Sequence, residues 1–304
     1  MELGRGPLAL GYFFLSLSLS THVLSVYRLL AIDIDGTLVN SRDELTPATR
    51  AALARAGQAG IRVVLATGRR YSHALPLVKP LEIDVPLVTA SGALVKDPAG
   101  HRTLYRAEFE PQVLREAVAI VDGCGFDPVL CADTFAEGFD FYHARKESRT
   151  PELAHYLAMN PGRSRLWPEL VKSPPPGVFG GFVVGTLEQM QDLEAVLSRK
   201  MPGKLHTHVL HPPRYRGFFI ELAPAGVTKW SAVQRLAADW GIAESEICAV
   251  GDDVNDIPMI RAAGLGVAMG NAQPSVKAAA DRIAPTHDED GLVQVVEWIL
   301  EGRD

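Results

Sequence analysis

The sequence has little cysteine, no excess of positive charge and no long uninterrupted apolar run. Its three cysteines, Cys124, Cys131 and Cys248, are too few and too scattered for a disulfide framework or a zinc site. The formal net charge of −6 argues against nucleic acid or an anionic membrane surface as a partner. Because the few cysteines indicate no disulfide framework, a reducing cytoplasm is the expected compartment.

The first 26 residues form an extension before the first expected strand. Arg5, followed by the apolar block from Leu8 to Leu19, resembles a weak signal peptide. The block is short for a bilayer span and is interrupted by serines, so we expect no membrane partner. A misassigned start, with Val26 as the initiator, is an alternative. We favour a dispensable extension over export.

The remaining chain is long enough for one large or two medium domains, and one stretch of it ends in two closely spaced carboxylates. An apolar run from Leu29 is typical of a buried parallel strand, and Asp33 and Asp35 stand at its carboxyl end. Alternate residues of an extended chain point the same way, so both carboxylates are aimed at one small volume. This pattern indicates a reaction site. Acidic turn residues that cap the next segment are the alternative, and the later motifs decide between the two.

The next unit has the spacing of a β-α-β motif. A helix is expected over residues 48–59 and a second buried strand over 62–66, which ends in Thr67 and Gly68. The sequence therefore predicts an α/β fold with a Rossmann-like, doubly wound parallel sheet. Thr67 comes to lie at the same sheet edge as Asp33, where its hydroxyl could bind a phosphoryl oxygen. A helix N-cap without a ligand is the alternative role.

The middle of the chain differs in character from its two ends. Between residues 94 and 216, strands and helices alternate less regularly, and the length and composition fit neither a loop nor a linker. We expect an inserted α+β domain there, with the core domain formed by residues 27–93 and 217–304. His206 and His208 would share one face of a strand, but no third ligand comes from the same run, so a polar face is favoured over a metal site.

Charged residues reappear where the core resumes. Lys229 falls in the first turn of a helix expected over residues 227–240, where the helix dipole disfavours a cation. We infer that this lysine is held there to meet an anion. A strand over 247–251 then ends in an acidic run, in which Asp252 and Asp256 occupy positions suited to ligands of a hard cation.

These segments resemble, in order, the four motifs of the haloacid dehalogenase superfamily, Cof-type phosphatase branch. The matching segments are Asp-Ile-Asp-Gly-Thr-Leu-Val from Asp33, Ala-Thr-Gly-Arg from Ala66, the lysine Lys229, and Gly-Asp-Asp-Val-Asn-Asp-Ile-Pro-Met from Gly251. The middle segment resembles the large cap of this branch. Two positions depart from the pattern: Ser91 stands where relatives commonly have asparagine, and Trp230 where they often have glycine.

The resemblance implies a Mg²⁺-dependent phosphatase that works through a phospho-aspartate. Asp33 would be the nucleophile, and Asp35 would act first as the acid and then as the base. Phosphate binding would fall to Lys229, Thr67, Gly68 and Asn255. The metal would be held by Asp33, the backbone carbonyl of Asp35, Asp252 and Asp256, the last directly or through water. Arg69 either contacts a phosphate or bounds the hinge of the cap.

The expected substrate is a small phosphorylated metabolite, most plausibly a sugar phosphate, by analogy with the family alone. Two other functions stay open. One is a phosphomutase or phosphotransferase on the same fold. The other is a sensor that binds a phosphorylated metabolite without turning it over, although such a protein would not need the acid at Asp35.

Overall fold

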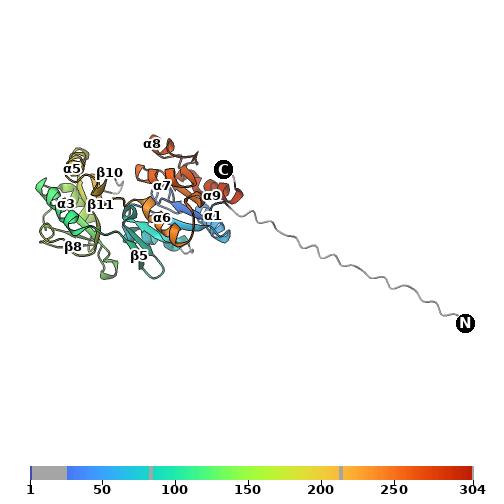
Figure 1. Ribbon diagram of the computed structural model, residues 1–304, viewed down its shortest axis with the longest axis horizontal. Helices are drawn as coiled ribbons and strands as arrows, with labels where there is room; N and C mark the ends of the chain where they lie inside the picture. The colour runs from blue at the N-terminus through green and yellow to red at the C-terminus, as the bar shows by residue number, and fades with distance from the viewer. Residues whose placement is uncertain (2–25, 82–84, 212–214, 303–304) are drawn as a thin grey trace.

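The computed structural model describes residues 1, 26–81, 85–211 and 215–302 of the 304-residue chain. Nearly all of the predicted amino-terminal extension, residues 1–26, lies outside these described residues. None of the helices within the described ranges combines the length and the apolar content that a bilayer span requires. The described chain forms two lobes, each built on its own β-sheet (Figure 1).

The larger sheet has six parallel strands extended by an antiparallel pair. In spatial order the described strands are β14 (Arg282–Ile283), β13 (Leu265–Ala268), β12 (Ile247–Gly251), β1 (Leu29–Ile32), β2 (Arg62–Ala66), β3 (Leu87–Thr89), β4 (Leu94–Asp97) and β5 (Arg102–Arg106). Pairing is parallel from β14 to β3 and antiparallel from β3 through β4 to β5. This arrangement confirms the predicted α/β class.

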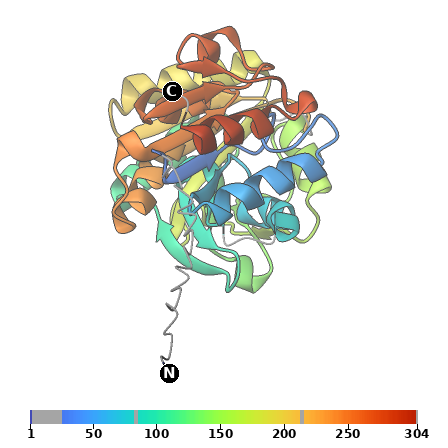
Figure 2. The same ribbon diagram turned by 90° about the vertical axis from the view of Figure 1, so that its right-hand side faces the viewer.

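Helices cover both faces of this sheet, because its strands bury side chains on both sides. The helices of this lobe are α1 (Pro47–Gln58), α2 (Tyr71–Val78), α6 (Lys229–Asp239), α7 (Ile257–Ala262), α8 (Pro274–Lys277) and α9 (Gly291–Glu301), with the short 3₁₀ helices η1 (Lys79–Leu81), η2 (Ala90–Gly92), η4 (Glu244–Glu246), η5 (Val254–Asp256) and η6 (His287–Glu289). Leu30 and Ile32 of β1 belong to the core that includes Leu53 of α1, and α1 and α9 lie side by side on that face (Figure 2). Leu29 belongs to the core on the α6 face, with Trp230.

The smaller sheet is mostly antiparallel. Its described strands run in the order β10 (Leu205–Leu210), β11 (Phe218–Pro224), β9 (Val178–Gly185), β6 (Val129–Ala132), β7 (Phe141–His143) and β8 (Ser164–Leu166). Its helices are α3 (Pro111–Gly123), α4 (Pro151–Met159), α5 (Leu187–Lys200) and the 3₁₀ helix η3 (Phe135–Glu137). A capping box at Thr186 starts α5, and the apolar side of that helix packs on the sheet.

Sheet membership differs from the expected boundaries at residues 94 and 216. Strands β4 and β5 extend the larger sheet by antiparallel pairing, although the sequence analysis placed them in the inserted domain. Strand β11 pairs with β9 and β10 in the smaller sheet, although it was expected to resume the core. An apolar run indicates a buried strand but does not say which sheet the strand joins, and this explains both differences.

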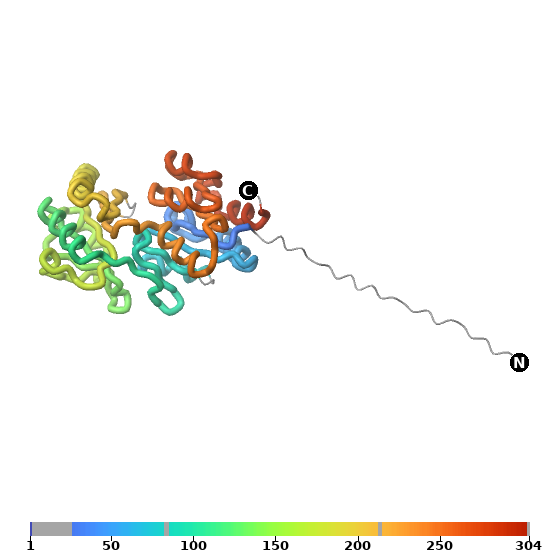
Figure 3. The backbone as a smooth tube through the Cα atoms, viewed as in Figure 1, coloured from blue at the N-terminus to red at the C-terminus, as the bar shows by residue number. Residues whose placement is uncertain are grey.

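The chain leaves the larger sheet after β5 and returns after β11, so two passages of the backbone connect the lobes (Figure 3). One passage lies beside Ala93 and the other beside Gly92. The backbone N–H of Ala107 donates to the carbonyl of Ala93 at 2.8 Å. Gly92 has φ +105°, and a Cβ at this position would lie 2.1 Å from the carbonyl oxygen of Thr228. A glycine is therefore required where the returning chain touches the loop after β3.

A buried polar cluster joins the two lobes around Arg70, the N-cap residue of α2. Its guanidinium donates to Asp140 Oδ2 at 2.6 Å and to Asn160 Oδ1 at 2.5 Å. Arg163 of the same lobe as Asp140 binds both oxygens of that carboxylate, at 2.9 and 2.7 Å. The guanidinium carbon of Arg70 also lies 4.9 Å from the ring centroid of Phe141, within range of a cation–π contact.

Candidate active site

The predicted site residues gather at the carboxyl edge of the larger sheet, where open α/β sheets bind ligands. Asp33 follows β1, Thr67 follows β2 and Asp252 follows β12, and these three strands are neighbours. Asp33 and Thr67 are buried, while Asp252 is partly exposed.

Lys229 lies at the centre of this group. Its Nζ donates to Asp33 Oδ1 and to Asp256 Oδ1, both at 2.6 Å, and to Asn255 Oδ1 at 3.0 Å. The side chain of Lys229 is 2% exposed, and its helix starts with a capping box between Thr228 and Ser231. The structure thus places Lys229 against anions, which here are carboxylates of the chain itself.

The protonation of the cluster reflects its burial and crowding. Burial raises the pKa of Asp33 well above its usual value, and nearby carboxylates raise it further, against the opposing charge of Lys229. Burial and the neighbouring Asp256 raise the pKa of Asp252 to about 7. Burial alone would lower the pKa of Lys229, but Asp256 and Asp33 together raise it above the ordinary value.

Three carboxylates of the cluster could hold a cation together. Asp33, Asp252 and Asp256 each offer one oxygen, and these oxygens lie within 4.8 Å of one another. Among the described residues one ammonium group, that of Lys229, contacts this cluster, so ionisation of all three acids would leave an excess of negative charge that a divalent cation would neutralise. Carboxylate oxygens are the ligands that hard divalent cations prefer.

Hydrogen bonds fix the orientation of Asp252 and Asp256, two of the acids that follow β12. Asp256 Oδ2 accepts from the backbone N–H groups of Asp252 and Asp253, at 3.0 and 3.1 Å. Asp252 Oδ1 accepts from the hydroxyl of Thr37 at 3.0 Å. A Cβ at Gly251 would lie 2.4 Å from the carboxyl carbon of Asp256, so the glycine leaves the space that this buried acid fills.

Asp35 lies outside the three-acid cluster. Its side chain is 55% exposed, and the guanidinium of Arg69 donates to both of its oxygens, at 2.9 and 2.5 Å. Thr67 Oγ1 accepts the backbone N–H of Arg69 at 3.0 Å, so this hydroxyl caps its own turn. The N-cap of α2 is Arg70, not Thr67, because the helix begins later than the sequence alternative implied.

Sequence reasoning missed Glu221, which comes from β11 of the smaller sheet. The hydroxyl of Ser91 donates to Glu221 Oε2 at 2.6 Å, and burial raises the pKa of this glutamate. A Cβ on Gly68 would lie 3.4 Å from Ser91 Oγ and 3.7 Å from Glu221 Oε1, so the pair borders the second motif. The sequence signal for this contact was Ser91, which stands where relatives commonly have asparagine. Its partner Glu221 lies 130 residues further along the chain, so the sequence did not indicate the contact itself.

Sequence reasoning also missed Asn271. Its side-chain N–H₂ donates to the carbonyl of Gly36 at 2.8 Å and lies 3.5 Å from Asp252 Oδ2. Its oxygen accepts the backbone N–H of His287 at 3.0 Å. Asn271 therefore ties the turn after Asp35 to the loop before α9.

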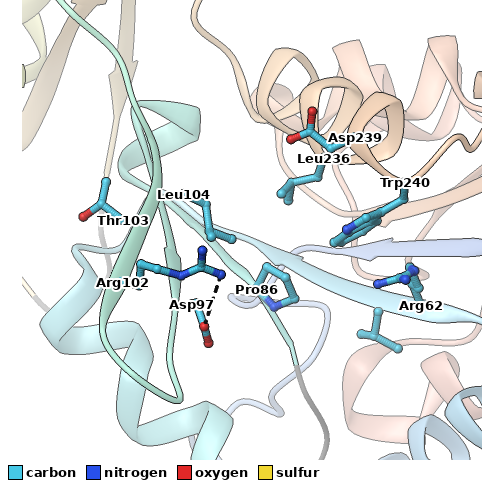
Figure 4. Close-up of a pocket in the computed structure, with 10 residues that line it drawn as sticks. Arg62, Pro86, Asp97, Arg102, Thr103, Leu104, Leu236, Asp239 and Trp240 are labelled. Atoms are coloured by element: carbon cyan, nitrogen blue, oxygen red, sulfur yellow. Dashed lines mark ion pairs between the residues drawn. The ribbon is translucent and has the colours of Figure 1, made fainter.

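A separate hollow lies near the opposite edge of the larger sheet. This cavity of about 410 Å³ is bounded by Arg62 and Pro86, near the amino ends of β2 and β3, and by Trp240 at the end of α6 (Figure 4). Asp97 and Arg102 form an ion pair of 3.9 Å on its wall. None of the residues that line it belongs to the acidic cluster.

Comparison with known protein families shows a match over most of the chain. A family described as haloacid dehalogenase-like hydrolase matches residues 30–296. The chain belongs to this family. The match confirms the predicted superfamily and the prediction of a hydrolytic enzyme.

The similar proteins match the chain over most of its length. Phosphatase YwpJ of Bacillus subtilis is 28% identical over 290 residues, which cover 90% of this chain and 100% of that protein. The 5-amino-6-(5-phospho-D-ribitylamino)uracil phosphatase YcsE of the same organism is 28% identical, covering 90% and 96%. A haloacid dehalogenase-like hydrolase from Bacteroides thetaiotaomicron has a similar structure, with 29% identity, a TM-score of 0.72 and coverage of 90% and 99%.

Proposed function

We propose that this chain is a Mg²⁺-dependent phosphomonoesterase that acts on small phosphorylated metabolites through a phospho-aspartate at Asp33. The observation that carries the proposal is the position of Lys229, which bridges Asp33 and Asp256 beside Asn255 at the carboxyl edge of the sheet. This ammonium group lies where the equatorial oxygens of a phosphoryl group bound to Asp33 need positive charge. A related phosphatase acts on a phosphorylated ribityl compound, which supports a sugar-like phosphate as the substrate.

The donor set fits Mg²⁺. Asp33, Asp252 and Asp256, with the backbone carbonyl of Asp35, would hold the ion, and the three side chains carry the excess of negative charge that such an ion neutralises. When bound, Mg²⁺ supplies Lewis-acid stabilisation of the phosphoryl oxygens and allows Asp33 to stay ionised beside the other acids.

The residues of the chain account for the remaining chemistry. An oxygen of Asp33 attacks phosphorus, while Lys229 and Asn255 hold the phosphoryl group in line and Thr67 and Gly68 border it. Asp35 gives its proton to the leaving oxygen. The resulting carboxylate then takes a proton from the water that releases phosphate from Asp33.

We propose that the smaller sheet and its helices form the cap over this site. The contacts that support this role are those of Glu221 with Ser91 and of Asp140 with Arg70, because each joins one lobe to the other at the edge that carries the site. From sheet membership, the cap would extend from Ala107 to Pro224 rather than over residues 94–216.

Phosphate release from p-nitrophenyl phosphate and a panel of sugar phosphates, with and without Mg²⁺, tests the function. We expect Mg²⁺-dependent turnover that Asp33→Asn reduces on the order of 10⁶-fold, the loss found when a hydrolase loses its covalent nucleophile. The matched control is Asp133→Asn, which changes a carboxylate outside the site. Transfer of phosphate to a second sugar instead of water would favour a mutase. Ligand binding without turnover would favour a sensor.

A further inference from the structure

Arg69 lies between the carboxylates of Asp35 and Asp43 and takes part in none of the catalytic steps proposed for this site. Its guanidinium donates to Asp35 Oδ2 through Nε at 2.9 Å, and to Asp35 Oδ1 and Asp43 Oδ1 through Nη2, both at 2.5 Å. The side chain of Arg69 is 11% exposed, whereas those of Asp35 and Asp43 are 55% and 31% exposed. The guanidinium is thus more deeply placed than either of its acidic partners.

The loop that carries Asp43 holds an uncommon backbone conformation. Asp43 has φ +63°, in the left-handed region that residues other than glycine adopt rarely. Asn40 stabilises this turn: its carbonyl accepts the N–H of Asp43 at 2.8 Å, and its side-chain oxygen accepts the N–H groups of Arg42 and Glu44. The turn presents the carboxylate of Asp43 to Arg69.

The backbone of Arg69 is also held from both sides. Its N–H donates to Thr67 Oγ1 at 3.0 Å, and its carbonyl accepts the N–H of Ala90 at 3.0 Å. The guanidinium therefore extends from a fixed point in the second motif, reaches Asp35 at the first motif and is steadied at its far side by Asp43.

We propose that Arg69 is a positioning residue for the leaving-group acid Asp35 and that Asp43 anchors it. The inference rests on the proposed function, in which Asp35 protonates the leaving oxygen. A guanidinium that engages both oxygens of a carboxylate fixes its plane and its distance, which a single ammonium group cannot do. Each oxygen of Asp35 keeps a further lone-pair direction for the proton that it transfers.

This orientation matters in the step that forms the aspartyl phosphate. A bond forms between an Asp33 oxygen and phosphorus while the bond from phosphorus to the leaving oxygen breaks. The proton of the Asp35 carboxyl passes to that oxygen, which yields an alcohol, an aspartyl phosphate and the Asp35 carboxylate. An alkoxide leaves poorly without this proton, whereas a nitrophenolate leaves well without it. Loss of positioning is therefore visible as a dependence on the leaving group.

The experiment compares kcat/KM for an alkyl phosphate that the enzyme turns over, such as a sugar phosphate, with kcat/KM for p-nitrophenyl phosphate. This ratio covers the steps up to departure of the leaving group and leaves out the later hydrolysis of the aspartyl phosphate, in which Asp35 acts as the base. Full-length protein with Mg²⁺ is used throughout. Arg69→Met is expected to lower kcat/KM on the alkyl phosphate by about 10²-fold, within the range of general acid catalysis, and on the aryl phosphate by less than about 3-fold. Asp35→Asn is expected to show the same selectivity, and the double variant no further loss.

Two further variants make the test independent of a single substitution. Asp43→Asn keeps the shape and the turn preference of Asp43, and about a 5- to 10-fold loss is expected on the alkyl phosphate only, since Arg69 loses its anchor but keeps Asp35. Arg69→Lys is expected to restore part of the alkyl activity that Arg69→Met loses. The matched control is Arg42→Met in the same loop, which removes an arginine that is 77% exposed and pairs only locally with Glu44.

Equal losses on both phosphates, in variants that melt like the wild type, would overturn the positioning role. A rise in KM with unchanged kcat would overturn it too, by showing that Arg69 binds substrate directly. Failure of the proposed function is distinguishable, because the wild type itself would then lack Mg²⁺-dependent turnover or Asp33→Asn would retain it.

Discussion

Two buried polar clusters of this protein differ in how they balance charge. The active-site cluster sets the three acids Asp33, Asp252 and Asp256 against the one ammonium group of Lys229. The lobe-joining cluster sets the one acid Asp140 against the guanidinium groups of Arg70 and Arg163, with Asn160 and aromatic faces completing it.

The difference separates a ligand site from a structural contact. In the lobe-joining cluster both oxygens of the single acid, Asp140, accept from guanidinium groups, so the chain itself compensates the charge of this carboxylate. In the active-site cluster burial and crowded acids raise the pKa values of Asp33 and Asp252, since a single lysine does not compensate three carboxylates. Buried charge that stays uncompensated indicates a place for a cation and an anionic substrate.

After loss of the nucleophile Asp33 itself, removal of the ammonium group of Lys229 should produce the largest effect on activity. Lys229→Met is expected to lower kcat/KM for a phosphate ester by about 10²–10³-fold, as loss of one preorganised electrostatic contact does. The matched control is Lys96→Met, because Lys96 is also buried and lies 2.6 Å from a carboxylate, that of Asp133, but belongs to β4 and not to the acidic cluster. Steady-state kinetics check both variants. A Lys229→Met enzyme with more than a tenth of wild-type activity would contradict the assignment.

Mg²⁺ should stabilise the folded protein through the active-site cluster and not through the lobe-joining cluster. At a Mg²⁺ concentration 100 times Kd, the wild type is expected to gain about 2.7 kcal/mol of unfolding free energy, since the ion binds the folded state. Asp252→Asn should lose most of this gain, whereas Asp140→Asn should keep it. Urea unfolding with and without Mg²⁺ measures both. An equal Mg²⁺ effect in the two variants would show that the acids near Lys229 do not bind the ion.

Breaking the lobe-joining cluster should affect stability. Arg70→Met is expected to cost about 1–3 kcal/mol of unfolding free energy, because Asn160 loses a donor while Asp140 keeps Arg163. Arg165→Met serves as the control, since the pair of Arg165 with Glu137 is half exposed on both sides and should contribute less than about 1 kcal/mol. Similar midpoints in chemical denaturation for the two variants would argue against a stabilising role for Arg70.

The smallest expected effect is a change in the pH dependence of folding stability that arises from His73, which lies beside Arg70. Burial, and then the charge of Arg70, lowers the pKa of His73 to about 4, against about 6.5 when unfolded. Between these values the unfolded chain binds more protons, so stability should fall as pH drops from about 6.5 towards 4. The partial exposure of the ring keeps the change below about 1 kcal/mol. His73→Gln should flatten the dependence, and unfolding at pH 7 and pH 5 compares the two proteins.

The sequence was sufficient to predict the parallel part of the larger sheet and the edge at which the candidate site residues gather. Parallel strands end at one edge, so the positions of Asp33, Thr67 and Asp252 followed from local strand patterns. The unfavourable place of Lys229 at a helix start correctly indicated an anionic partner. Each of these inferences used residues that lie within one strand or one helical turn.

What the sequence could not give are partners that lie far apart along the chain. Arg70 meets Asp140 and Asn160 only because α2 faces the other lobe, and Arg69 meets Asp43 only through the conformation of an intervening loop. The sequence also placed β11 in the core, whereas this strand pairs with β9 in the smaller sheet. Its apolar pattern fits either sheet, so the pattern could not identify the partner strand.

Of the two passages of the chain between the lobes, one lies beside Ala93 and the other beside Gly92. The backbone therefore connects the smaller lobe to the larger one at a single place, while the contacts of Arg70 and Ser91 with the smaller lobe are made by side chains. Its two ends also emerge side by side from the larger lobe. A segment attached in this way can be lengthened, shortened or exchanged during evolution without changing the path of the strands that hold Asp33 and Asp252.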